Sequence, residues 1–126
     1  MSLCSRVLKG AALAAVVLVP AVAYAADTDG VGGTVVAVTV NESKADDYAV
    51  EHGNIIVSEG AVTRKYQWGG TACSGYLLSA AHITLLVDAM KNPDRLQVVP
   101  SFKPGNNLAR CLVGFKLVAL SPSVAR

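Results

Sequence analysis

Few side chains in this sequence combine the residue types and the spacing that catalysis needs. Ser79 and His82 are three positions apart, and Asp88 follows in the same helical pattern. A hydroxyl, an imidazole and a carboxylate are the groups that nucleophilic hydrolysis uses. However, no cysteine, aspartate or second histidine lies at ligand spacing from His82, and a histidine near a helix start is an ordinary structural residue. We therefore rank a small hydrolase as the least favoured function, and we expect no metal or cofactor.

A second set of candidate residues is aromatic. Tyr66, Trp68 and Tyr76 lie close together in the sequence, next to the glycine-rich stretch of residues 69–75. Exposed aromatic side chains are frequent hot spots of protein interfaces, so these three residues and His82 are the candidate binding residues. The structural alternative is that a helix buries Tyr66 and Trp68 in the core, and we favour it for those two. Tyr76 is the aromatic residue that we expect at the surface.

The cysteines predict one covalent cross-link. The chain has three cysteines. Cys4 lies in the N-terminal segment, residues 1–25, which we expect to be cleaved, so Cys73 and Cys111 are the pair that remains. In an oxidising compartment, an even number of cysteines indicates a disulfide. Closing a loop of this length stabilises a fold by on the order of 4 kcal/mol. A reactive thiol would need a nearby base or a second close cysteine, and the sequence shows neither.

The N-terminal segment, residues 1–25, has the features of a cleaved secretory signal. Arg6 and Lys9 form a basic start, an apolar run follows, and an Ala-x-Ala motif ends at Ala25. The apolar run is short for a membrane span, which needs about 20 residues. We expect cleavage after Ala25, export to the periplasm or secretion to the medium, and no stable membrane insertion after the signal is cleaved.

The balance of charge excludes one class of partner. The chain has 11 Lys and Arg and 9 Asp and Glu, but Arg6 and Lys9 leave with the signal segment, so the mature chain has no net charge. It lacks the basic excess of nucleic-acid-binding proteins, and we expect no nucleic acid. Acidic residues are concentrated in residues 26–62 and basic residues in residues 63–126. This asymmetry predicts either a bipolar surface that steers a partner or two halves that interleave and neutralise each other, and we favour the second.

Hydrophobic periodicity predicts the elements that position these residues. Alternating apolar residues indicate strands at residues 34–41, 54–59, 62–68, 95–102 and 110–119. Between the third and fourth of these strands, Ser79 fits a helix cap and Pro93 fits a helix stop. The helix that they bound, over residues 79–92, has one apolar face, which consists of Ile83, Leu86, Val87 and Met90.

Three further features of the local structure follow from the sequence. Residues 43–53 fit either a short helix or a strand, and the strand is favoured because another strand follows at hairpin distance. Residues 103–106 read Lys-Pro-Gly-Asn, which fits a type II turn. In the strand after this turn, alternation places Cys111 on the apolar face that carries Phe115.

Together these features predict a single α+β domain over residues 34–120. Its small antiparallel sheet of five or six strands has one helix packed on one face and is tied by one disulfide. A flexible acidic leader, residues 26–33, precedes the domain, and a frayed tail, residues 121–126, follows it. The favoured function is an exported binding or inhibitory module whose partner is another exported or envelope protein. The alternative is an accessory protein of envelope assembly that presents a sheet edge to its partner.

Intact mass spectrometry of protein recovered from its native exported fraction checks the covalent predictions. The mature chain is expected to begin at Ala26. Alkylation without reductant is expected to leave Cys73 and Cys111 unmodified, and reduction is expected to expose both thiols to the reagent. Two thiols that react before reduction, in protein that has lost its signal, would contradict the disulfide.

Overall fold

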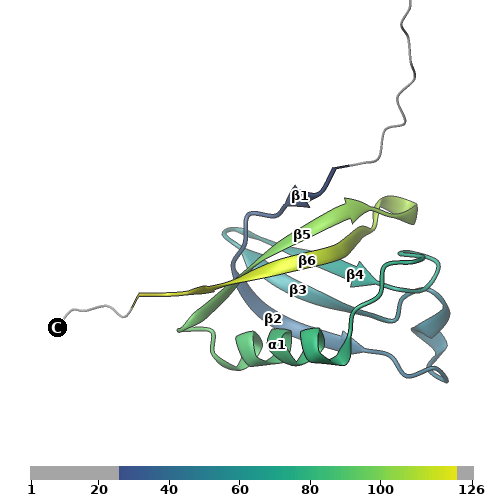
Figure 1. The fold of residues 1–126 in the computed structure, drawn as a ribbon, viewed down its shortest axis with the longest axis horizontal. Coiled ribbons are helices and arrows are strands. Elements are labelled where there is room, and N and C mark those ends of the chain that lie inside the picture. The colour runs from purple at the N-terminus through teal and green to yellow at the C-terminus, as the bar shows by residue number, and fades with distance from the viewer. Residues whose placement is uncertain (1–25, 122–126) are drawn as a thin grey trace, which may run out of the picture.

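The computed structural model describes residues 26–121. The predicted signal segment, residues 1–25, and residues 122–126 of the predicted tail lie outside the described residues, so the predictions about them stay predictions. The described chain forms one sheet of six strands and one α-helix, α1 (Ala80–Lys91), as Figure 1 shows. The strands are β1 (Thr28–Asp29), β2 (Thr34–Val40), β3 (Gly53–Glu59), β4 (Val62–Trp68), β5 (Leu96–Pro104) and β6 (Arg110–Ala119). Their order in the sheet is β1-β5-β6-β4-β3-β2, and the predicted α+β fold is confirmed.

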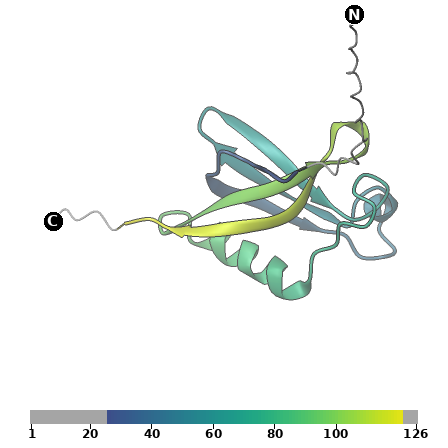
Figure 2. The same ribbon diagram turned by 45° about the horizontal axis from the view of Figure 1, so that its top comes forward.

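The sheet consists of two antiparallel wings. β2, β3 and β4 form a meander, whereas β5 and β6 form a hairpin with the short β1 on its outer edge. Between the described strands of the two wings there is one pair of residues, Gln67 of β4 with Cys111 of β6. These two strands run parallel, whereas the other neighbouring strands in the described sheet are antiparallel. The sheet also curls, so that Gly33, just before β2, bridges Val98 of β5. Figures 1 and 2 accordingly show the hairpin crossing over the meander, with α1 along one side.

The main core lies between the two wings and α1. Because successive side chains of a strand point to opposite faces, the alternation in the meander turns one apolar set inward. The buried residues of this set are Val35, Ile55, Val57, Tyr66 and Trp68. The other members of the core are Leu86 and Ala89 of α1, Val98 of β5 and Leu112 of β6. Helix α1 and every strand except β1 thus contribute to one apolar interior.

Helix α1 begins where the sequence predicts. Ser79 has an extended backbone, with φ −76° and ψ 159°, and its side chain accepts a hydrogen bond from the backbone N–H of His82. This bond satisfies one of the N–H groups that a helix start leaves without an intrahelical partner. On the inner face, Leu86 is fully buried as predicted, whereas Ala89 takes the second buried position instead of Val87.

The strand favoured for residues 43–53 is wrong. This connection between β2 and β3 contains a short 3₁₀ helix, η2 (Asp46–Ala49). The reason is that β2 and β3 pair directly with each other, with Val40 opposite Gly53, so the residues between them double back and cannot add a strand. The ring of Tyr48 stacks on His52 at a centroid distance of 4.1 Å and closes the loop.

The leader, residues 26–33, belongs to the sheet instead of forming the flexible arm that its composition predicts. Its strand β1 pairs with β5. The backbone N–H of Gly30 donates to the carbonyl of Pro100 at 2.7 Å, and Lys103 Nζ lies 3.3 Å from Asp27 Oδ1. Backbone hydrogen bonds to an existing strand need no apolar side chain, which is why a polar, glycine-rich composition did not reveal the pairing.

The connection between β5 and β6 differs from the predicted type II turn. Such a turn would give Gly105 a positive φ, but its φ is −118°. The loop instead contains a 3₁₀ helix, η3 (Asn106–Leu108), in which Asn107 and Leu108 have φ values of 56° and 64°. Glycine is needed at position 105 because a Cβ atom there would lie 2.3 Å from Cys111 Sγ.

A β-bulge determines which face of β6 carries Cys111. Between Leu112 and Gly114, β6 has one residue more than β5. The extra residue places Leu112 and Phe115 together at the main core and turns Cys111 to a second, smaller cluster. The prediction that Cys111 shares the face of Phe115 is wrong for this reason.

The acidic and basic halves of the chain interleave. Within residues 26–121, three ion pairs each join an acidic residue of the first half, residues 26–62, to a basic residue of the second half. These pairs are Glu59 with Arg64, Glu51 with Lys65 and Asp27 with Lys103. They support the interpretation in which the two halves neutralise each other.

Replacement of Leu86 by Ala is expected to lower the free energy of unfolding by about 2 to 5 kcal/mol, because it leaves a cavity in the main core. The matched control is Leu85→Ala on the same helix, where the side chain is 40% exposed and a much smaller loss is expected. Urea denaturation of both variants measures the difference. Equal losses would show that the inner face of α1 is assigned incorrectly.

Candidate functional site

Three connections meet at one end of the molecule, which we call the loop end: the β2–β3 loop, the segment between β4 and α1, and the β5–β6 loop. Their backbones are hydrogen-bonded to one another. Thr71 and Ala72 donate their N–H groups to the carbonyls of Ala49 and Val50, both at 2.9 Å, and Asn106 donates its N–H to Ala72 at 3.0 Å. Binding residues are often carried by loops, and here each loop restrains the others.

The Cys73–Cys111 disulfide lies within the loop end. Its Cα atoms are 5.4 Å apart, and both cysteines are fully buried, so the predicted pairing is confirmed. Ala72 and Ala109 join them in a small second core, and Tyr76 packs against it. The loop end therefore has an apolar and covalent base of its own, separate from the main core.

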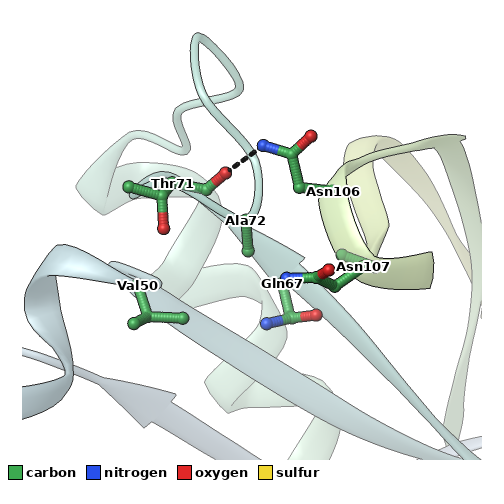
Figure 3. Close-up of a pocket in the computed structure, with 7 residues that line it drawn as sticks. Val50, Gln67, Thr71, Ala72, Asn106 and Asn107 are labelled. Atoms are coloured by element: carbon green, nitrogen blue, oxygen red, sulfur yellow. Dashed lines mark hydrogen bonds between the residues drawn. The ribbon is translucent and has the colours of Figure 1, made fainter.

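The loop end contains a polar pocket of about 390 Å³, shown in Figure 3. Its walls consist of Val50, Gln67, Thr71, Ala72, Asn106, Asn107 and Ala109, none of which is charged. The Asn106 amide donates to the carbonyl of Thr71 at 2.6 Å, and the Gln67 amide donates to Glu51. In both cases the amide nitrogen is the bonded atom, so each amide oxygen can accept a hydrogen bond from a ligand.

Leu108 forms the tip of the loop end. Its side chain is 95% exposed. Both Leu108 and the preceding Asn107 have a positive φ, in the left-handed region of backbone conformation. This conformation costs a leucine roughly 1–2 kcal/mol. Backbone hydrogen bonds hold the loop in shape, from Gly105 to Ala109 at 2.8 Å and from Ala109 to Asn106 at 3.1 Å. Strained backbone positions of this kind cluster at functional sites.

The four predicted binding residues lie in three different places. Tyr66 and Trp68 are 0% and 2% exposed and belong to the main core, as the structural alternative has it. Tyr76 is half-buried against the second core and lines a hollow that also includes Asn106. His82 is exposed at the start of α1. The four residues do not form one aromatic patch, and Tyr76 is the one among them that belongs to the loop end.

Ser79 and His82 are in contact, as hydrolysis would require. Ser79 Oγ lies 3.0 Å from His82 Nδ1, and it also accepts the backbone N–H of His82 at 3.2 Å. The second bond is the helix cap, which explains Ser79 without catalysis. In the part of the chain that the structure describes, no hydrogen bond or ion pair joins His82 to a carboxylate, and no group of three or more His, Cys, Asp or Glu could hold a metal ion. The helix cap by itself is sufficient to explain the contact between Ser79 and His82.

A buried carboxylate, which no sequence pattern predicted, lies at the other end of the meander. Glu59 is 5% exposed, and its Oε2 accepts hydrogen bonds from the Tyr66 hydroxyl at 2.7 Å and from the N–H of Gly32 at 3.3 Å. Arg64 Nε lies 3.1 Å from Oε1, in ion-pair contact but outside hydrogen-bond geometry. Burial, reinforced by the hydrogen bond to Glu59, raises the pKa of Tyr66 far above its ordinary value of 10.0. The cluster fastens the leader to the meander.

No family model, curated protein or solved structure matches the chain. Among the described residues, no helix is long and apolar enough to cross a membrane. Function is therefore inferred from the geometry of the chain itself.

The sequence held a partial signal for the residues of the loop end. Asn107 follows Pro104 and Gly105, in a stretch whose composition favours turns. Leu108 had no such signal, because leucine is not a residue that turns select.

The unfolding free energy of the wild-type protein is expected to fall as the pH rises above 10. The folded-state pKa of Tyr66 is raised above its unfolded value of 10.0, so the stabilisation from its neutral hydroxyl is complete below pH 10 and is lost progressively above it. Denaturant titrations at a series of alkaline pH values measure this loss. Tyr66→Phe lacks the hydroxyl and is expected to lose less stability over the same range. Parallel losses in both proteins would contradict the raised pKa.

Proposed function

We propose that this chain is an exported binding module that engages another exported or envelope protein through its loop end. The observation that carries the proposal is Leu108, an apolar side chain that is 95% exposed and held in a strained conformation beside a polar pocket. An apolar anchor next to uncharged hydrogen-bonding groups is the arrangement of an interface hot spot and its rim.

The rigidity of the loop end supports this proposal. The disulfide, the Asn106 hydrogen bonds to Thr71 and Ala72 and the bonds across the β5–β6 loop fix the anchor before any partner arrives. Ordering a flexible loop on binding costs free energy, and a loop that is already ordered avoids most of that cost. A small protein that inhibits or sequesters a partner benefits from such preorganisation.

The chemistry of the pocket limits the kind of surface that the partner presents. Its polar groups include the amides of Gln67, Asn106 and Asn107, which can both donate and accept hydrogen bonds. Amide groups match the peptide bonds and neutral side chains of a protein surface, whereas a strongly ionic ligand would call for opposite charges in the walls. Export to the periplasm or the medium is part of the proposal. It rests on the predicted signal, residues 1–25, and the disulfide is compatible with export.

Capture experiments with two matched variants test the proposal. The oxidised mature protein, Leu108→Ser and Val62→Ser are immobilised and exposed to the native exported fraction. Val62 is the control because it is 48% exposed but lies at the start of β4, at the opposite end of that strand from the loop end. Leu108→Ser is expected to lower the recovery of the bound protein by about tenfold or more, as loss of a hot spot does. Val62→Ser is expected to recover it like the wild type.

Circular dichroism and denaturation of the three proteins establish that the variants fold. Identical sets of captured proteins from wild type and Leu108→Ser would refute an interface at the loop end. Loss of capture in Val62→Ser as well would place the interface elsewhere and refute it too.

A further inference from the structure

One edge of β6 has no strand partner along most of its length. On one side, β6 pairs with β5 from Arg110 to Ala119. On the other side, the pairing is limited to Cys111, which pairs with Gln67 of β4. From Leu112 onward, none of the strands in the described chain pairs with this second edge. A bare edge presents backbone N–H and C=O groups at the spacing that an added strand needs.

The outer edges of the sheet are better protected. β1 is two residues long. The start of β2 is held at β5 by the bridge between Gly33 and Val98. The pairing of β2 with β3 also shifts register, between Val35 and Ala37. Short edge strands and bulges are the usual devices against unwanted strand pairing. The bulge of β6 lies between Leu112 and Gly114, so a regular stretch from Gly114 to Ala119 remains for strand addition. This stretch is longer than the regular stretch of β2 from Ala37 to Val40, which is also unpaired on its outer side.

A cleft of about 480 Å³, lined mainly by apolar residues, lies beside this edge. Its walls are Val113, Gly114 and Phe115 of β6 on one side and Leu77, Leu78, His82 and Leu85 on the other. Helix α1 packs mainly on β2 and β5, which leaves the cleft open. Leu77 and Leu85 are 69% and 40% exposed, and the rings of His82 and Phe115 meet edge to face at 6.2 Å. Alternate side chains of an added strand would point into such a cleft.

Charge around the cleft favours a peptide that carries a carboxylate. None of its wall residues is acidic, and Asp88 of α1 lies outside the walls. The cleft borders the N-terminal end of α1, which carries a positive partial charge. The electrostatic complement of these features is an acidic side chain or a C-terminal carboxylate.

We infer that the cleft between β6 and α1 binds an extended peptide segment of a partner protein, which adds as a strand to the free edge of β6. One apolar side chain of the segment fills the space between Leu77, Leu85 and Phe115, and a carboxylate lies toward the start of α1. Backbone hydrogen bonds provide affinity and the cleft provides selectivity, as in other cases of strand addition. The cleft is distinct from the polar pocket of the loop end, because the two share no wall residue.

Selection from a library of random peptides displayed with free C-termini tests this inference on the oxidised mature protein. The selected peptides are expected to alternate apolar and polar residues and to carry a carboxylate. Hydrogen exchange of the protein with and without a selected peptide is expected to show new protection at amides between Leu112 and Ala119. Protection confined to the loop end, or an absence of selected peptides, would overturn the inference.

Two substitutions at one position separate the cleft from other surfaces. Leu85→Glu places a negative charge in the cleft and is expected to weaken binding of the selected peptide by about tenfold or more relative to Leu85→Lys, which has a similar length and a positive charge. Leu108→Ser is expected to leave peptide affinity unchanged, whatever becomes of the loop-end interface. Equal affinities of the Glu and Lys variants would overturn the inference. So would a dimer of the mature protein formed through the β6 edge, because a second copy would then be the occupant.

Discussion

The single residue pair between β4 and β6 is the constraint on which the rest of the structure depends. The meander and the hairpin meet where Gln67 pairs with Cys111, and the bond from Cys111 to Cys73 reinforces the same point covalently. A small sheet or a lone hairpin is marginally stable in water unless its apolar face is covered. The join brings two such faces together with α1, so that they enclose one core. Without it, each wing would expose the side chains that now cover the other.

The same join accounts for both of the surfaces that we propose as binding sites. Because the wings diverge from one pair, β6 continues beyond the end of β4 without a neighbour, and its second edge stays open. At the pair itself, the connections that follow β4 and β5 are brought side by side. Hydrogen bonds from the β4–α1 segment then draw in the β2–β3 loop and complete the polar pocket. One topological feature thus produces a preorganised loop end and an unpaired strand.

Sequence patterns predicted the features that neighbouring residues decide. The Ser79 cap, the alternation in β3 and β4 and the pairing of Cys73 with Cys111 all follow from local spacing or from a count. The features that the sequence did not reveal depend on segments far apart in the chain. The leader pairs with β5 through its backbone, and the face of Cys111 depends on a bulge that exists only relative to β5.

The candidate site follows the same rule. Tyr76 could be placed near the surface from its glycine-rich surroundings, and the core role of Tyr66 and Trp68 from the alternation of β4. The pocket could not be foreseen, because its walls come from three connections that only the fold brings together. The conformation of Leu108 also escapes local patterns. It belongs to a loop whose first residues are bonded to Thr71 and Ala72, so a distant segment sets its shape.

Singly exposed leucines are common and need no explanation, but Leu108 also has a left-handed backbone, which asparagine or glycine would adopt at lower cost. Exposed to water, it recovers none of that cost by packing. Folding gains little from a side chain that is 95% exposed, whereas a partner that buried it would add about 1.5–3 kcal/mol of apolar stabilisation. This contrast supports recognition as the proposed role of Leu108.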